Sequence, residues 1–309
     1  VCHLTSLPDV LSHNNQNLEF LKLKHCPDLT HIVPEWGFGA CLREFQICNC
    51  DNLMELPNDL HSLKSLERLE IDSCPKLKSF PTPNGQEGLK SLRHLRIYNC
   101  GGLTSLPGEM LDSCTWLESL WVNYCRNLAS LPVNLHHMSA LSSLEVFKCP
   151  KLTSLPEGLC CLSRLSELQI GPFSNSMDFD PFQIIFNGLH LLSSSLRELT
   201  LYGWPHWDAL PCQLQHLTAL TELQIHNFSI DALPHWIGNL VSLEALCLHF
   251  CEKLRFLPCM QNLSKLNSLS ILFCPLLEER CTPQIGPDSQ WSRISHIPHI
   301  YIDGRRIQA

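Results

Sequence analysis

Hydrophobic residues recur along this chain at a nearly constant interval. The clearest copy of the pattern, LSSLEVFKCPKLTSLP, runs from Leu141 to Pro156. Within it Leu144 and Val146 are two residues apart, so both side chains point to the same side of an extended segment. The pattern therefore predicts one short strand in each copy, with one face of that strand buried.

Successive copies start 23 to 26 residues apart, except for one step of 31. A period of roughly 20–29 residues is typical of leucine-rich repeats, in which each copy buries its apolar side chains only against its neighbours. We therefore expect an α/β leucine-rich-repeat solenoid, or horseshoe. Its parallel β-sheet should line the concave face, and short helical or irregular segments should form the convex face. The copies start at Leu18, Leu42, Leu66, Leu92, Leu117, Leu141, Leu165, Leu196, Leu220, Leu243 and Leu266.

The chain has 18 cysteines, and many of them occupy one position of the copy, just after the strand segment. Cysteine is a small, weakly polar side chain that is easily buried. We expect reduced, buried thiols at this position, which favours a reducing compartment; disulfides and metal ligation are the alternatives. The cysteines at this position are Cys26, Cys50, Cys74, Cys100, Cys125, Cys149, Cys251 and Cys274.

The repeats imply a single domain over residues 1–309. Residues 1–17 match part of a first repeat, residues 18–274 hold the repeats, and residues 275–309 are interpreted as a C-terminal cap. The repeat at 165–195 is longer and irregular, and its segment 171–195 is either a packed repeat or a protruding contact loop. The final IYID is a candidate last strand. The candidate cap residues are Trp291, Ile294, Ile297, Pro298, Ile300 and Ile302.

Composition and missing motifs reduce the number of function classes that the chain could have. A formal charge of −8 leaves no basic surface for nucleic acid, and no apolar run is long enough to predict a membrane span. The sequence lacks the G-x-S-x-G, H-E-x-x-H and glycine-rich nucleotide-binding motifs, so we expect no enzyme activity, no metal and no cofactor in this chain. The chain begins at Val1 with part of a copy, and we expect it to be a piece of a longer protein.

Several motifs carry a family resemblance. They are the reiterated L-x-x-L-x-I-x-x-C-x-x-L-x-x-L-P, the phrases CPKLKSFP, CPKLTSLP and CEKLRFLP, the irregular GPFS copy leading to LRELTLYGWP, and the ending CPLLEERC…W…ISHIPHIYIDG. With these motifs the chain resembles the C-terminal leucine-rich-repeat domain of plant nucleotide-binding leucine-rich-repeat (NLR) disease resistance proteins of the coiled-coil type. The resemblance covers essentially the whole chain, and the ending is its most specific part.

The resemblance implies a cytoplasmic protein-recognition and regulatory domain of an immune receptor. Such a domain senses a pathogen effector or an effector-modified host protein, and it restrains the upstream nucleotide-binding domain of the same chain. ADP or ATP would bind only in that upstream domain, because this sequence has no G-x-x-x-x-G-K-[ST] loop. Two alternatives remain open: the substrate-binding half of a ubiquitin-ligase adaptor, and a fragment of an extracellular receptor, which the N-x-S patterns at Asn227 and Asn262 allow.

Recognition is expected on the concave face, where strand residues between the buried positions point outward. Aromatic and arginine side chains are the usual anchors of protein interfaces, and Trp121 is the most informative residue. Arg96, Tyr98, Trp121, Tyr124 and Phe147 form the candidate hot-spot patch; in the alternative interpretation these aromatics only pack across strands. The full set of candidate protein-binding residues is Arg68, Glu70, Asp72, Arg93, Arg96, Tyr98, Trp121, Tyr124, Phe147, Lys148, Tyr202 and Phe250.

Overall fold

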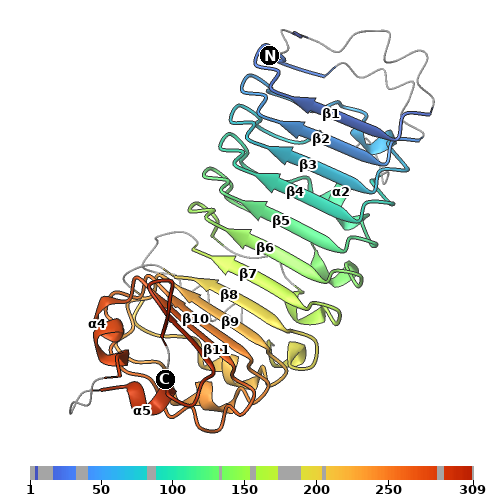
Figure 1. The fold of residues 1–309 in the computed structure, drawn as a ribbon. Helices are drawn as coiled ribbons and strands as arrows, with labels where there is room; N and C mark the ends of the chain where they lie inside the picture. Colours follow the sequence, from blue (N-terminus) through green and yellow to red (C-terminus); the bar gives the residue numbers. More distant parts are fainter. Residues whose placement is uncertain are drawn as a thin grey trace. The chain divides into compact units, whose positions relative to one another are not determined.

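The computed structural model describes residues 4–5, 17–32, 41–81, 88–131, 134–153, 158–172, 189–203, 207–283 and 289–307. These residues fall into two compact units. The first unit holds the described residues up to Arg164, and the second holds those from Leu165 onward. Figure 1 shows a stack of strands joined by short connections in each unit. Most of the irregular segment 171–195 lies outside the described residues, and the single-domain organisation stays a prediction.

The strands of the first unit are parallel and follow one another in chain order. Each strand begins two residues after the start that the repeat pattern predicts; the copy at Leu141, for example, has its strand from Ser143. The predicted strands are therefore confirmed. They are β1 (Phe20–Lys24), β2 (Glu44–Cys48), β3 (Arg68–Asp72), β4 (His94–Tyr98), β5 (Ser119–Asn123) and β6 (Ser143–Phe147).

In the second unit the strands again pair in chain order, and β7 to β12 are parallel. The expected strand at IYID is confirmed as β12. The strands are β7 (Glu167–Gly171), β8 (Glu198–Tyr202), β9 (Glu222–His226), β10 (Ala245–His249), β11 (Ser268–Leu272), β12 (His299–Ile302) and β13 (Arg305–Ile307).

The predicted parallel sheet is confirmed, and at its C-terminal end one further strand, β13, runs antiparallel to β12. Asp303 and Gly304 join the two strands, and both have positive φ angles of 47° and 74°. Two central residues with positive φ suit the right-handed twist of a tight hairpin, and Asp-Gly is a preferred dipeptide for it. The chain therefore ends its described part in a hairpin rather than in another repeat.

Alternate strand residues and the repeated cysteines form the core. In β4, for example, Leu95 and Ile97 are 1% and 0% exposed. All eight cysteines at the repeated position are buried, as the sequence predicts. Their thiols also form hydrogen bonds: Cys100 Sγ donates to the carbonyl of Tyr98 at 3.4 Å, and Cys74 Sγ donates to that of Asp72 at 3.5 Å. The position therefore selects a residue that is small and apolar yet has a weak donor.

The residue between each strand and its cysteine adopts a left-handed backbone in most copies. Its N–H continues the ladder by donating to the carbonyl at the end of the next strand, as from Tyr124 to Phe147 at 3.0 Å and from Phe250 to Leu272 at 2.9 Å. This conformation costs most L-residues roughly 1–2 kcal/mol. We call these residues the left-handed column: His25, Asn49, Ser73, Asn99, Tyr124, Lys148, Asn227, Phe250 and Phe273.

The return segments are short helical turns, as predicted, and each places at least one apolar side chain in the core. They are η1 (Leu60–Ser62), α2 (Gly108–Asp112), η2 (Leu135–His137) and η3 (Leu159–Cys161) in the first unit. The second unit has η4 (Leu189–Leu192), η5 (Cys212–His216) and η6 (His235–Asn239).

After the last repeat come α4 (Pro275–Glu278), η7 (Glu279–Cys281) and α5 (Trp291–Ile294). The buried Gln290 side chain accepts a hydrogen bond from Leu257 N at 3.1 Å, and Arg293 donates to Leu257 O at 2.9 Å. These contacts join the C-terminal segment to the turn after β10. Of the six candidate cap residues, Ile294, Ile297 and Ile300 are buried, Trp291 and Ile302 are partly buried, and Pro298 is exposed.

Candidate protein-binding face

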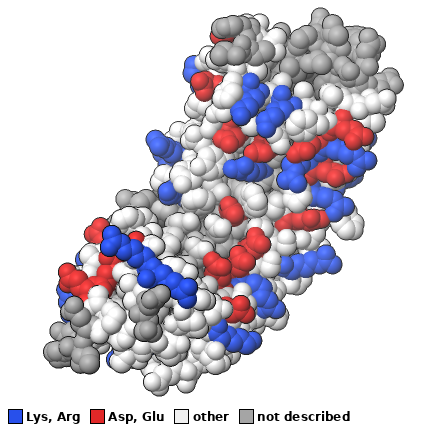
Figure 2. Space-filling view, in the orientation of Figure 1, with Lys and Arg blue, Asp and Glu red and all other residues white. Residues whose placement is uncertain are grey.

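Alternate residues of β1 to β6 point away from the core and form one surface, which we call the first-unit face. Because the strands are parallel and in register, these residues lie in rows that run across the strands. Basic and acidic side chains lie next to one another over this part of the molecule (Figure 2). The charged residues at outward strand positions are Lys22, Lys24, Arg68 and Arg96, balanced by Glu44, Glu70, Asp72 and Glu145.

Cross-strand ion pairs hold the arginines of this face. Arg96 Nη1 lies 2.8 Å from Glu70 Oε1, and Arg68 Nε lies 3.3 Å from Glu44 Oε1. Arg93, which directly precedes β4, pairs with Glu118 at the edge of the face. Exposed pairs of this kind contribute only about 0.2–1 kcal/mol each to stability. Their main effect is to fix where the guanidinium groups lie.

An aromatic strip crosses the first-unit face. The rings of Tyr98 and Tyr124 are 5.0 Å apart between centroids, and those of Tyr124 and Phe147 are 5.1 Å apart. Tyr124 belongs to the left-handed column, so this column lies beside the last outward position of the neighbouring strands. Lys148 Nζ donates to the Tyr124 hydroxyl at 3.1 Å and lies 4.7 Å from the centre of its ring. Arg96 lies over Tyr98 at 5.4 Å.

Trp121 lies beside this strip at the centre of β5. Its indole N–H donates to Ser143 Oγ at 3.0 Å, which fixes the ring orientation. Together with Arg68, Glu70 and Arg96 it lines a shallow depression of about 260 Å³. Trp121 is partly exposed and stacks on none of the three rings of the aromatic strip. Its hydrogen-bonded ring is therefore available as a rigid wall for a bound side chain.

The structure brings most of the sequence-predicted residues of the first unit together. Arg68, Glu70, Arg96 and Trp121 surround the depression, whereas Tyr98, Tyr124, Phe147 and Lys148 form the strip. Asp72 lies opposite Tyr98 in the register and accepts a hydrogen bond from the Ser73 hydroxyl at 2.8 Å. The aromatics pack on one another as the alternative interpretation expects, and they remain partly exposed. Packing and recognition are therefore compatible.

Two predicted residues belong to the second unit and are described separately. Tyr202 stacks on His226 with ring centroids 4.6 Å apart, and Phe250 stacks on Phe273 at 4.8 Å. Phe250 is 47% exposed and Phe273 is 55% exposed. Phe250 is among the candidate residues predicted from the sequence, but Phe273 is not. The sequence could have indicated Phe273 as well, because Phe273 directly precedes its cysteine as Phe250 does.

Sequence reasoning also missed a polar pair that supports the aromatic strip. The nearly buried Asn123 donates through Nδ2 to Glu145 Oε2 at 2.9 Å. Its Oδ1 accepts from the backbone N–H of Phe147 at 3.3 Å. Aligning the copies would have placed Asn123 in the row between Tyr98 and Phe147, where an amide side chain differs from the flanking aromatics.

The described residues contain no group of three or more His, Cys, Asp or Glu side chains arranged to hold a metal ion. The nearest approach to such chemistry is a contact of 3.1 Å between Cys161 Sγ and His136 Nδ1 at the surface. Burial raises the pKa of the Cys114 thiol and of the Cys281 thiol to about 12 in each case, which keeps these two thiols protonated at neutral pH. None of the described helices has the length and apolar character needed to cross a bilayer.

Comparison with known proteins matches residues 205–274 to the family model of R13L1/DRL21 leucine-rich repeats. The Arabidopsis thaliana protein SUPPRESSOR OF npr1-1, CONSTITUTIVE 1 is 29% identical over 240 residues, which are 76% of this chain. The chain spans only 13% of the length of that relative. The matched family describes repeats and is not a catalytic family. The chain has the leucine-rich-repeat fold, with one strand of a parallel sheet in each copy.

Two solved structures match this chain at low sequence identity. A leucine-rich-repeat protein of Leptospira interrogans is 20% identical, with 97% of this chain and 93% of that chain covered and a TM-score of 0.36. The ectodomain of the Arabidopsis thaliana receptor kinase GASSHO1/SCHENGEN3, solved in complex with CASPARIAN STRIP INTEGRITY FACTOR 2, is also 20% identical. Here 86% of this chain and 40% of that chain are covered, with a TM-score of 0.40.

Proposed function

We propose that the first-unit face recognises a protein on behalf of a cytoplasmic plant immune receptor of the nucleotide-binding leucine-rich-repeat class. Its partner is a pathogen effector or a host protein altered by one. Without that partner, the domain restrains the nucleotide-binding domain expected upstream in the same chain. The repeated motif and the chain ending support the receptor class, as does the similarity to an Arabidopsis protein.

The observation that carries the recognition role is the arrangement around Trp121. An indole, a guanidinium and an aromatic strip lie on one face, and each is oriented by a contact within that face rather than by burial in the core. Trp, Tyr and Arg dominate the binding energy of protein interfaces, and side chains that are already oriented lose less entropy on binding. A complementary partner would present both an apolar side chain and mixed charges.

The test is an interaction screen of the reduced 309-residue chain against pathogen effectors and host proteins. It is repeated with Arg96, Trp121 and Phe147 each replaced by alanine. Loss of a central anchor typically costs about 2 kcal/mol or more, so we expect the affinity for a specific partner to fall roughly 30-fold. Far-UV circular dichroism and thermal melting of each variant show whether the fold is retained.

Trp116→Ala is the matched control. Trp116 is 62% exposed and lies outside the strands, so its removal deletes the same side chain away from the first-unit face. A partner that binds Trp121→Ala as well as it binds the unaltered chain would refute recognition through this face. The receptor class has its own test in the upstream coding sequence. A phosphate-binding loop is expected there, whereas an F-box or a signal peptide would favour the adaptor or the ectodomain.

A further inference from the structure

The second unit exposes an aromatic pair at its surface. Phe250 and Phe273 stack with an angle of 24° between their ring planes, and about half of each side chain is exposed. Both belong to the left-handed column, with φ angles of 58° and 54°. Polar or small residues such as Asn49, Ser73 and Asn99 occupy the same column elsewhere. A bulky ring is disfavoured in that backbone conformation, and only about half of each ring is buried to offset this cost.

The position of this pair on the sheet follows from the first unit. There the Tyr124 ring, also in the left-handed column, contacts Tyr98 and Phe147 at the last outward position of the neighbouring strands. In the second unit that position holds Tyr202, His226 and His249, whose rings contact one another in sequence. The phenylalanine pair therefore lies along the same edge of the sheet as this row of rings.

Charge distinguishes this surface from the first-unit face. The outward positions of β7 to β11 carry three glutamates and no lysine or arginine. Glu198 lies in register with Glu167 on one side and Glu222 on the other. Parallel strands are about 4.8 Å apart, and like charges directly opposite one another are unfavourable. Burial and then the neighbouring Glu222 and Glu167 raise the pKa of Glu198.

The glutamate row has no counterion among the described residues. None of the three carboxylates forms an ion pair in the part of the chain that the structure describes, and only Gln224 donates to Glu222, at 2.6 Å. Arg197 precedes Glu198 but directs its guanidinium to the carbonyl of Ala219 at 3.0 Å. A polypeptide with lysine or arginine side chains would supply the missing positive charge.

We propose that the outward face of β7 to β11 binds a basic polypeptide segment of a partner protein, with Phe250 and Phe273 receiving an aromatic or aliphatic side chain of that segment. The glutamate row supplies the charge complementarity, and the stacked phenylalanines supply the apolar contact. This surface uses none of the first-unit residues assigned above. It can therefore be tested whether or not the first-unit face recognises an effector.

The probe is a short synthetic peptide of Lys, Phe and Gly, blocked at both ends. Two control peptides replace its lysines by Glu or its phenylalanines by Ser. Binding to the reduced chain is measured by fluorescence anisotropy at low and at physiological salt. We expect the Lys–Phe peptide to bind at least about tenfold more tightly than either control, and to weaken as salt rises. Equal binding of the Glu peptide would overturn the proposal.

Variants locate the binding surface. Glu198→Gln with Glu222→Gln keeps the shape while removing two charges, and Phe250→Ala with Phe273→Ala removes the rings. Each pair should weaken binding at least about tenfold. The matched controls in the first unit are Phe20→Ala, where the ring is also 47% exposed, and Glu109→Gln on α2. They should leave the affinity unchanged.

Photo-cross-linking of the peptide to the unaltered chain, followed by mass spectrometry, locates the binding surface without any variant. Its result therefore does not depend on whether a variant folds. Cross-links to β7 to β11 or to Phe273 are expected. Cross-links confined to the first unit, or undiminished binding by the double variants, would refute this surface. Trp121→Ala should leave peptide binding intact, which separates this outcome from any failure of the first-unit face to bind an effector.

Discussion

Gly203 and Phe228 should depend on each other for stability. Phe228 holds the position that cysteine occupies in most copies, and its ring lies against Gly203 in a site where it is only 1% exposed. A Cβ atom at residue 203 would lie 2.6 Å from Phe228 Cδ2. Carbon atoms pack at about 3.5–4.0 Å, so the ring would have to move by about 1 Å. Overpacking of this kind typically costs about 1–3 kcal/mol, which is our prediction for Gly203→Ala.

The second change, Phe228→Cys, introduces the cysteine that most other copies have at this position. Phe228→Cys removes the ring and leaves a cavity, and truncating a buried phenylalanine costs about 3–5 kcal/mol. In that background the methyl group of Gly203→Ala enters empty space. Its own cost should then fall below about 0.5 kcal/mol, so the two changes should be coupled by about 0.5–3 kcal/mol.

Urea unfolding followed by circular dichroism measures the four members of this cycle. Gly101→Ala is the control for the backbone effect of adding a methyl group, because a Cβ at residue 101 would meet nothing within 4 Å. It should change stability by less than about 0.5 kcal/mol. If the costs of Gly203→Ala and Phe228→Cys simply add, the steric account of this repeat is wrong.

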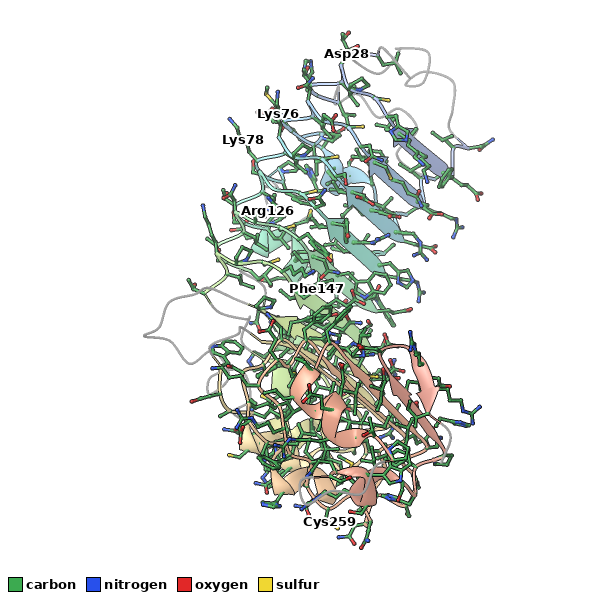
Figure 3. The ribbon with its side chains drawn as sticks, turned by 60° about the vertical axis from the view of Figure 1, so that its left-hand side comes forward. Asp28, Lys76, Lys78, Arg126, Phe147 and Cys259 are labelled. Atoms are coloured by element: carbon green, nitrogen blue, oxygen red, sulfur yellow. The ribbon has the colours of Figure 1, made fainter. Side chains whose placement is uncertain are left out.

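Three further predictions follow from burial and charge. At pH 8 a thiol reagent should label the exposed Cys259 (Figure 3) but not the buried Cys114. Burial raises the pKa of Cys114 from 9.0 to about 12, which lowers its thiolate fraction roughly a thousandfold. Full labelling should require denaturant. Because the pKa of Glu198 is raised, its carboxylate opposes folding at neutral pH; Glu198→Gln should raise the melting temperature at pH 7, and the gain should vanish below the unfolded pKa of about 4.3. Gln290→Ala should cost about 1–3 kcal/mol in urea unfolding, because it leaves the N–H of Leu257 without its partner.

The repeat period predicts the scaffold because each copy buries the same side chains. The leucines and the cysteine position recur at fixed offsets, so the strand of every copy could be located to within two residues. The antiparallel β13 was missed for a different reason. It arises from the local Asp303–Gly304 turn, which lies outside the period but carries a recognisable hairpin dipeptide.

The candidate face was predicted less completely, because the period constrains only inward positions. Which residues point outward follows from alternation, but which of them touch depends on pairing across copies of unequal length. Arg96 and Glu70 are 26 residues apart, whereas Asn123 and Glu145 are 22 apart. Arg96 and Glu70 hold the same position in neighbouring copies, so alignment of the copies would have found this pair. The second pair is diagonal and follows from side-chain conformations that the sequence does not encode.

The separation between inward and outward positions has a consequence for function. In β4 and β5 the leucines that hold the strands together alternate with Arg96 and Trp121, which contribute little to the core. Exchanging outward residues should therefore change the chemistry of this surface at small cost to the fold. Among the described residues, the outward charges of β1 to β6 are balanced, whereas the glutamates of β7 to β9 form no ion pair. Like charges in register oppose folding, which fits the proposed role of these glutamates in binding better than a role in stability.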